Sequence, residues 1–113
     1  MDSGQDKKMD AQSMKDVVAK RLLAIIDEFK LTEDGDGAAR SLGEICGGAN
    51  SSAASNWLQG YNFPKIPQLI ALCDRTGITL DWLLRGTLGT MNVQLGNRLN
   101  KLTLTKTLPK ERH

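Results

Sequence analysis

The sequence predicts an all-α protein, and three observations support this fold class. Apolar side chains recur at helical spacing in successive segments. Residues that suit helix N-caps precede these segments, and glycine or proline residues follow them. We expect a five-helix domain over 13–86, with a flexible arm at 1–12 and an extension at 87–113.

The first helix is expected over about 14–30. Ser13 followed by Asp16 resembles a capping box, in which the first side chain bonds a backbone N–H of the first turn. One face of this helix then carries apolar residues at helical spacing, interrupted by Arg21. These apolar residues are Val17, Val18, Leu22, Ile25, Ile26 and Phe29.

Two short helices are expected next, separated by "GGAN" at 47–50. Asp36, in an acidic and glycine-rich loop over 31–37, is the predicted N-cap of the short helix before "GGAN". Asn50 or Ser51 suits the N-cap of the short helix after it. The two glycines permit the positive φ angles that a tight turn between helices needs. The second helix ends in Trp-Leu-Gln-Gly, a pattern typical of a helix with a glycine stop.

The fourth and fifth helices follow an extended connector, because Pro64 and Pro67 disfavour helical geometry in the residues before them. "PQLIALCDRTG" predicts a helix with Pro67 in its first turn and Gly77 at its end. Thr79 then suits the cap of "LDWLLRG". The side chains expected to face inward are Trp57, Leu69, Ile70, Leu72, Cys73, Leu80, Trp82, Leu83 and Leu84.

Beyond Gly86 two patterns overlap. An apolar stripe with spacings of four and three residues predicts a helix, although Gly96 disfavours it by about 1 kcal/mol relative to alanine. "LTLTKTL" at 102–108 alternates apolar and polar residues as a strand does, and Leu102 fits either element. The stripe consists of Met91, Leu95, Leu99 and Leu102.

Composition limits the function classes. The net charge of +2 combines −3 over residues 1–37 (six basic, nine acidic) with +5 over 38–113 (nine basic, four acidic), and the positive part is compatible with an anionic partner. Without an apolar run of membrane-spanning length or a secretory signal, we expect a cytoplasmic protein. Two cysteines without a CxxC pair, both expected to be buried, and a single His113 predict no metal site, no cofactor and no enzyme.

The two short helices around their glycine turn resemble the helix-turn-helix of the phage-repressor and Cro family. "NWLQG", a proline-containing connector and "LIALCDRTGITLDWLLRG" are similar to that family's usual continuation, so the resemblance covers about 18–86. Three departures stand out. Gly43 replaces a small alanine, two glycines stand where one is usual, and Ala54 takes the place of an isoleucine or valine anchor.

The resemblance implies a lambda-repressor-like fold and a sequence-specific double-stranded DNA-binding regulator. The major groove, about 12 Å wide, admits one α-helix, and an asparagine can bridge N6 and N7 of adenine. The candidate base contacts are Ser51, Ser52, Ala53, Ser55 and Asn56. The other candidate DNA contacts are Arg40, Asn50, Gln59, Tyr61, Asn62 and Lys65.

The family also implies a repressor of phage or prokaryotic origin that binds a palindromic operator as a homodimer. The stripe of Met91, Leu95, Leu99 and Leu102 is the predicted dimer contact, and no small-molecule ligand or membrane partner is expected. The alternative is a protein-interaction module, as in antitoxin or adaptor proteins, with 88–113 binding a protein partner. An uncharged third helix is less surprising in such a module than in a DNA-binding domain.

Overall fold

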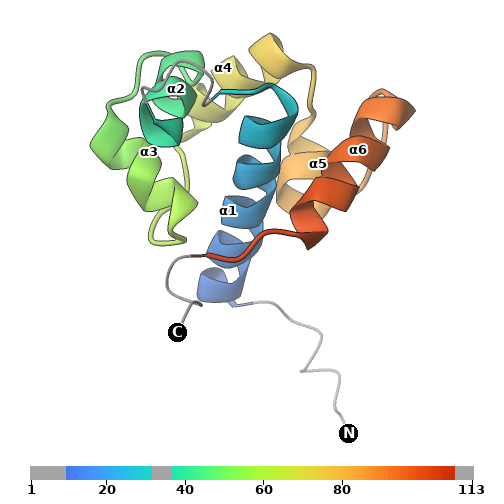
Figure 1. Ribbon diagram of the computed structural model, residues 1–113, viewed down its shortest axis with the longest axis horizontal. Coiled ribbons are helices and arrows are strands. Elements are labelled where there is room, and N and C mark those ends of the chain that lie inside the picture. The colour runs from blue at the N-terminus through green and yellow to red at the C-terminus, as the bar shows by residue number, and fades with distance from the viewer. Residues whose placement is uncertain (1–9, 32–36, 109–113) are drawn as a thin grey trace, which may run out of the picture.

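Helix α1 (Ala11–Glu28) is the central element of the computed structural model, which describes residues 10–31 and 37–108 (Figure 1). Helices α2 (Ala38–Ile45) and α3 (Ser51–Leu58) lie on one side of α1, and α5 (Leu80–Arg85) and α6 (Val93–Leu104) lie on the other. Helix α4 (Ile66–Thr76) connects the two sides. The described residues contain helices and no strand, so the all-α class is confirmed.

Local sequence signals set most helix ends as predicted. The side chains of Asn50 and Thr79 accept hydrogen bonds from backbone N–H groups at 2.8 and 3.1 Å, and they cap α3 and α5. Gly77 and Gly86 end α4 and α5 with φ angles of 82°, in the left-handed conformation that glycine adopts without steric cost. Pro67 lies in the first turn of α4 as expected.

The start of α1 differs from the prediction. The N-cap is Asp10 and not Ser13, because the Asp10 carboxylate accepts a hydrogen bond from the Ser13 backbone N–H at 2.7 Å. This bond also holds the pKa of the Asp10 carboxyl below its usual value. Residues 11 and 12, expected in the arm, are therefore helical. The predicted cap Asp36 lies outside the described residues, and α2 begins after Gly37 without a side-chain cap.

The core forms where the apolar faces of the helices meet α1. Leu22 and Ile25 of α1 are fully buried, as are Leu42 of α2 and Leu72 of α4. Both tryptophans and Cys46 are buried as expected, whereas Cys73 is half-buried. Ile70 and Leu80 were predicted to face inward and are exposed instead, because α4 and α5 each turn only one narrow side to the core. The other fully buried side chains are Val18, Leu83, Leu99 and Leu108.

Arg21 interrupts the apolar face of α1 for a structural reason. Its guanidinium Nη1 donates a hydrogen bond at 3.0 Å to the carbonyl oxygen of Leu83, near the C-terminus of α5. Carbonyl groups there have no partner within the helix, and a cation near them is favoured by the helix dipole. Partial burial lowers the pKa of Arg21. A Cβ at Gly86 would collide with this guanidinium, so the glycine both ends α5 and makes room for Arg21.

The turn between α2 and α3 depends on three glycines. Gly47 and Gly48 have φ angles of 84° and 86°, which other residues rarely adopt. The Gly43 carbonyl accepts hydrogen bonds from the backbone N–H groups of Gly48 and Ala49 at 3.1 and 2.9 Å. A Cβ at Gly43 would collide with the Ala49 carbonyl oxygen. Gly43 therefore lets the chain fold back closely, and this close approach fixes the angle at which α3 leaves the turn.

Helix α6 corrects two predictions for the C-terminal segment. Residues 102–104 are helical and no strand follows within the described residues, so the predicted strand is wrong. The Met91–Leu99 stripe packs against α1 in the core of the same chain, where Met91 is 4% and Leu99 0% exposed. Leu95 and Leu102 are partly buried against the same core. Met91 and Leu99 are therefore not accessible for a dimer contact in this fold.

Two further contacts hold α6 in place. The indole N–H of the buried Trp82 donates a hydrogen bond to Oδ1 of Asn100 at 2.8 Å. Gly96, which weakens the helix locally, lies under the side chain of Leu88, and a Cβ there would overlap that side chain. The glycine thus improves packing at the expense of helix propensity.

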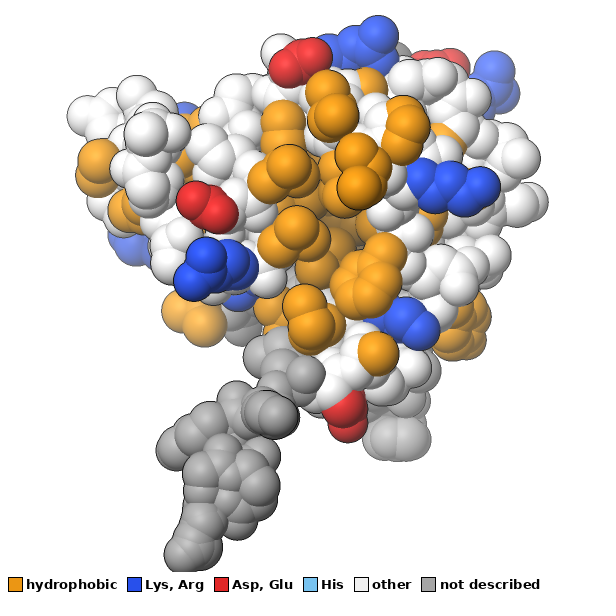
Figure 2. Space-filling model, turned by 180° about the vertical axis from the view of Figure 1, so that it is seen from behind, with side chains coloured by type: hydrophobic (Ala, Val, Ile, Leu, Met, Phe, Trp, Pro, Cys, Tyr) orange, Lys and Arg blue, Asp and Glu red, His pale blue; other side chains and the backbone are white. Residues whose placement is uncertain are grey.

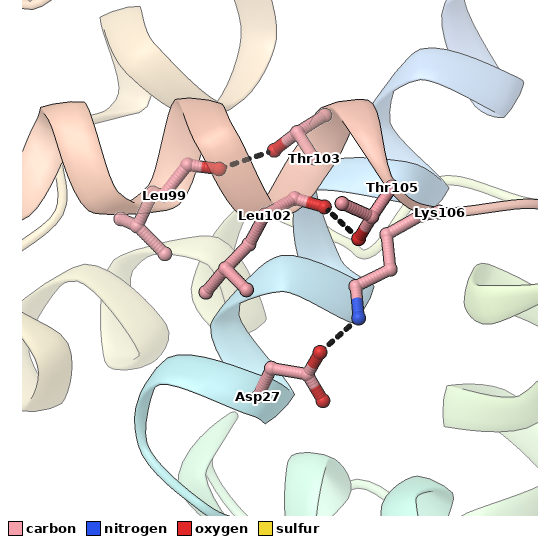
Figure 3. A network of polar contacts seen from close by, with 6 residues as sticks. All are labelled: Asp27, Leu99, Leu102, Thr103, Thr105 and Lys106. Carbon is pink, nitrogen blue, oxygen red and sulfur yellow. Dashed lines mark hydrogen bonds and ion pairs between the residues drawn. The ribbon is translucent and has the colours of Figure 1, made fainter.

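Two basic residues of the C-terminal extension form ion pairs with α1. Arg98 Nε forms an ion pair with Glu28 Oε2 at 2.9 Å, and Lys106 Nζ pairs with the carboxylate of Asp27 (Figure 3). Thr103 Oγ1, at the end of α6, donates to the Leu99 carbonyl oxygen at 2.7 Å. Two basic groups of the C-terminal extension therefore neutralise carboxylates of α1. The described helices include none that is both long and apolar enough to cross a membrane.

Candidate functional site

A groove runs along one flank of α3, and we call it the amide groove. Its volume is about 780 Å³, and its apolar wall contains Trp57 and Phe63. Helix α3 contributes to it directly, while α1, the connector before α4 and α4 itself supply the opposite wall. The polar residues that line it are Lys15, Asn50, Asn56, Asn62, Lys65 and Gln68.

A second, shallower hollow lies on the other flank of α3, between this helix and α2. It has a volume of about 370 Å³, and we call it the serine hollow. It is lined by Ala39, Ser51, Ser52, Ser55 and Asn56. Small side chains predominate here, so another molecule can approach the α3 backbone closely from this side.

Asn56 lines both the amide groove and the serine hollow, so it lies on the ridge between them. Its neighbours Ala54 and Trp57 are buried against the core and fix the rotation of α3. Among the described residues, no hydrogen bond engages the side-chain amide of Asn56. An asparagine amide offers two N–H donors and one oxygen acceptor in a single plane. Asn56 therefore presents an unoccupied amide where the two hollows meet.

The site carries positive charge only at its edge. Lys15 of α1 and Lys65 before α4 line the amide groove, and among its described lining residues there is no carboxylate. Lys15 Nζ lies 5.9 Å from the centre of the Phe63 ring, a cation–π distance that restrains this long side chain. The arrangement combines neutral donors and acceptors along α3 with two cations beside them. It suits an anionic ligand that also offers hydrogen-bonding groups.

The structure brings together most of the predicted base contacts. Ser51 and Ser52 are exposed, and Ala53, Ser55 and Asn56 are half-buried along the same helix. Asn50 lies at the N-terminus of α3, but its side-chain oxygen is used for the cap. A ligand contact of Asn50 can use its NH₂ group or the second lone pair of this oxygen.

Three of the other predicted DNA contacts lie outside both hollows. The Gln59 side chain donates to the carbonyl and the hydroxyl oxygens of Ser55 at 3.2 and 2.9 Å, so it serves the last turn of α3. Tyr61 is half exposed and lines neither hollow. Arg40 lies on the exposed side of α2 at 3.8 Å from the carboxylate of Glu44, a surface pair that is worth little. Asn62 and Lys65, by contrast, line the amide groove as predicted.

Sequence reasoning missed Lys15 and Gln68. Lys15 continues the spacing of the buried Val18 and Leu22, so the apolar stripe of α1 already indicated that it points toward neighbouring helices. Gln68 could not have been found in this way. Its side-chain oxygen accepts from the backbone N–H of Lys65 at 2.7 Å, which orients the start of α4 beside α3.

The described residues contain no cluster of three or more His, Cys, Asp or Glu side chains that could hold a metal ion. Burial raises the pKa of the Cys46 thiol to about 12, against the opposing influence of Arg75, so this thiol stays protonated at neutral pH. Comparisons with protein-family models, curated proteins and solved structures found no match. The functional conclusion therefore rests on the chemistry of the site.

Proposed function

We propose that this protein is a sequence-specific double-stranded DNA-binding transcriptional regulator. Helices α2 and α3 with their glycine turn would act as a helix-turn-helix, and α3 would enter the major groove. The observation that carries the proposal is the ridge of α3, where Asn56 presents an unengaged amide between two open hollows. An asparagine in this position can pair with N6 and N7 of adenine.

The composition of α3 supports the same function. Its side chains that are not buried are three serines, an alanine and an asparagine, which are short enough for the helix backbone to come near the base edges. Residues 50–60 carry no charge, so specificity would come from hydrogen bonds and methyl contacts. The cap at Asn50 and the buried Trp57 give the helix a fixed orientation, as a surface that reads a defined sequence requires.

The two lysines of the amide groove supply the complementary contact. Phosphate groups flank the major groove on both sides, and lysine side chains bind them without regard to sequence. Lys15 and Lys65 line the groove beside α3, where one strand of the duplex would pass. Asn62 adds a neutral donor on the same wall. In this proposal, α3 contacts the base edges and determines the sequence preference, and the residues of the amide groove bind the DNA phosphate backbone.

The regulator would act as a repressor, of phage or prokaryotic type, by occupying an operator. A single α3 of eight residues touches few base pairs, and isolated modules of this size bury a small interface. Two copies on a palindromic site, with half-sites about 34 Å apart, would supply the missing specificity.

The proposal is tested by selecting bound fragments from random double-stranded DNA with the full chain. Enrichment of one motif, repeated at a spacing of one helical turn, is the expected result. Affinity for that motif should fall steeply as salt rises, because several phosphate contacts release counterions. Recovery of unenriched DNA, or an affinity that salt does not change, would refute sequence-specific DNA binding.

The second candidate is a protein-interaction module, and an exposed apolar surface on the face opposite to the view of Figure 1 favours it (Figure 2). Binding through that surface should be nearly independent of salt, because it buries apolar groups and not phosphate contacts. The salt dependence of the complex thus separates the two functions.

A further inference from the structure

A band of hydrophobic side chains crosses the face opposite to the view of Figure 1, and charged side chains lie at its border (Figure 2). A hollow of about 250 Å³ lies between the connector, α1, α4 and α5, and it is lined by apolar side chains only. The hollow is lined by Met14, Phe63, Pro64, Leu69 and Leu84. Together with Ile66 and Ile70 of α4, these residues form what we call the apolar face.

The apolar face contains projections next to its hollow. Ile66 and Ile70 are 69% and 49% exposed, and they are one helical turn apart on α4. Leu69, which lines the hollow, lies between them in sequence and is almost fully buried. Adjacent exposed isoleucines on one helix, beside an open apolar hollow, are costly in water and mark an interaction surface.

No remaining segment of the chain has the composition to cover this face. Residues 1–9, 32–36 and 109–113 contain Met1, Met9 and Pro109 as their only apolar residues other than glycine. The other apolar segment, the stripe of α6, is already buried against α1. None of these segments therefore has the apolar side chains that would cover the apolar face.

We infer that the apolar face is a homodimer interface, in which Ile66 and Ile70 of each copy enter the hollow of the other. A two-fold interface is formed by the same patch on both subunits, so a projection must meet a recess of that same patch. The apolar face has both, side by side. Because its hollow carries no charge, two identical faces meet without electrostatic repulsion, and homodimer cores are typically apolar.

The position of the interface bears on DNA binding, and this consequence rests on the proposed function. Phe63 lines both the hollow of the apolar face and the amide groove beside α3. Pairing through the apolar face would therefore fix the two amide grooves, and with them the two α3 helices, relative to one another. The half-site spacing would be set by α4 and the connector, and not by α6.

Sedimentation equilibrium of the full chain without DNA tests the interface. We expect a dimer whose dissociation constant rises at least tenfold in Ile66→Lys and in Ile70→Lys, because each would bury an ammonium group in the partner's hollow. The matched control is Val93→Lys, which changes an equally exposed apolar residue (59%) on α6, away from the apolar face. Thermal unfolding of each variant verifies that the helices remain folded.

A wild-type chain that stays monomeric would overturn the inference and leave a different protein as the occupant. It would also be overturned if Val93→Lys weakened the dimer as much as the two α4 variants, or if those variants left it intact. Failure of the proposed function has a different signature. A chain that forms the α4-dependent dimer but selects no DNA motif would support the proposed interface and refute the proposed DNA-binding function.

Discussion

Helices α3 and α6 are both short amphipathic helices, but they use their surfaces in opposite ways. Helix α3 buries Ala54 and Trp57 against the core and exposes a row of small polar groups around Asn56. Helix α6 buries Leu99 completely and carries exposed apolar side chains, Val93 and Leu104, on its outer side. The polar face of α3 has the properties of a contact surface, whereas the exposed residues of α6 stand apart from one another.

The difference shows what an apolar stripe can and cannot indicate. The spacing of Met91, Leu95 and Leu99 shows that one side of the helix must be buried, and it is. The spacing contains no information about whether the covering surface belongs to the same chain or to a second one. A neutral polar face on a short, well-capped helix is a better indicator of a contact with another molecule, because packing within the chain does not require it.

The largest effect is expected for Leu99→Ala, which tests the role of α6. Removing a fully buried leucine should lower the free energy of unfolding by about 2–5 kcal/mol, measured by urea denaturation. Leu104→Ala is the control, because its 87% exposed side chain should change stability by less than about 0.5 kcal/mol. In the Ile66→Lys background, the loss at Leu99 should persist and should not depend on protein concentration. A loss that depends on protein concentration there would place Leu99 in a dimer contact and not in the core.

Most of the fold could be predicted because its determinants are local. The caps Asn50 and Thr79 and the stop at Gly77 depend on a few neighbouring residues, which the sequence displays directly. The errors arise where distant segments meet. Gly96 reduces helix propensity on its own, and only its contact with Leu88 explains why a helix continues through it.

The candidate site shows the same limit. The residues of α3 could be placed on one surface from their spacing and from the resemblance to a known motif. The contribution of Lys15 depends on the packing of α1 beside α3, because the residue is far from α3 in the sequence. Gln59 is a predicted DNA contact, but its bonds to Ser55 hold its amide against α3.

A smaller effect, confined to binding, is expected for Asn56→Ala. The variant should lose about 1–3 kcal/mol of affinity for the selected operator, with little change in thermal stability, because the amide has no partner within the described structure. Asn97→Ala is the matched control, an exposed asparagine on α6. Titration of labelled operator DNA measures the difference. Equal affinity of wild type and Asn56→Ala would remove this residue from the base contacts and would weaken the contrast between α3 and α6.

The smallest effect on affinity is expected for Lys15→Ala and Lys65→Ala. The informative quantity is the salt dependence of the affinity, more than the size of the loss. Each variant should reduce the slope of log affinity against log salt by about 1, because each removes one phosphate contact. Lys101→Ala, an exposed lysine of α6, should leave the slope unchanged. Since phosphate contacts carry no sequence information, the two groove variants should weaken operator and random DNA alike, whereas Asn56→Ala should weaken the operator alone. If Lys15→Ala instead altered the preferred sequence, the proposed division between a selecting helix and a holding groove would be wrong.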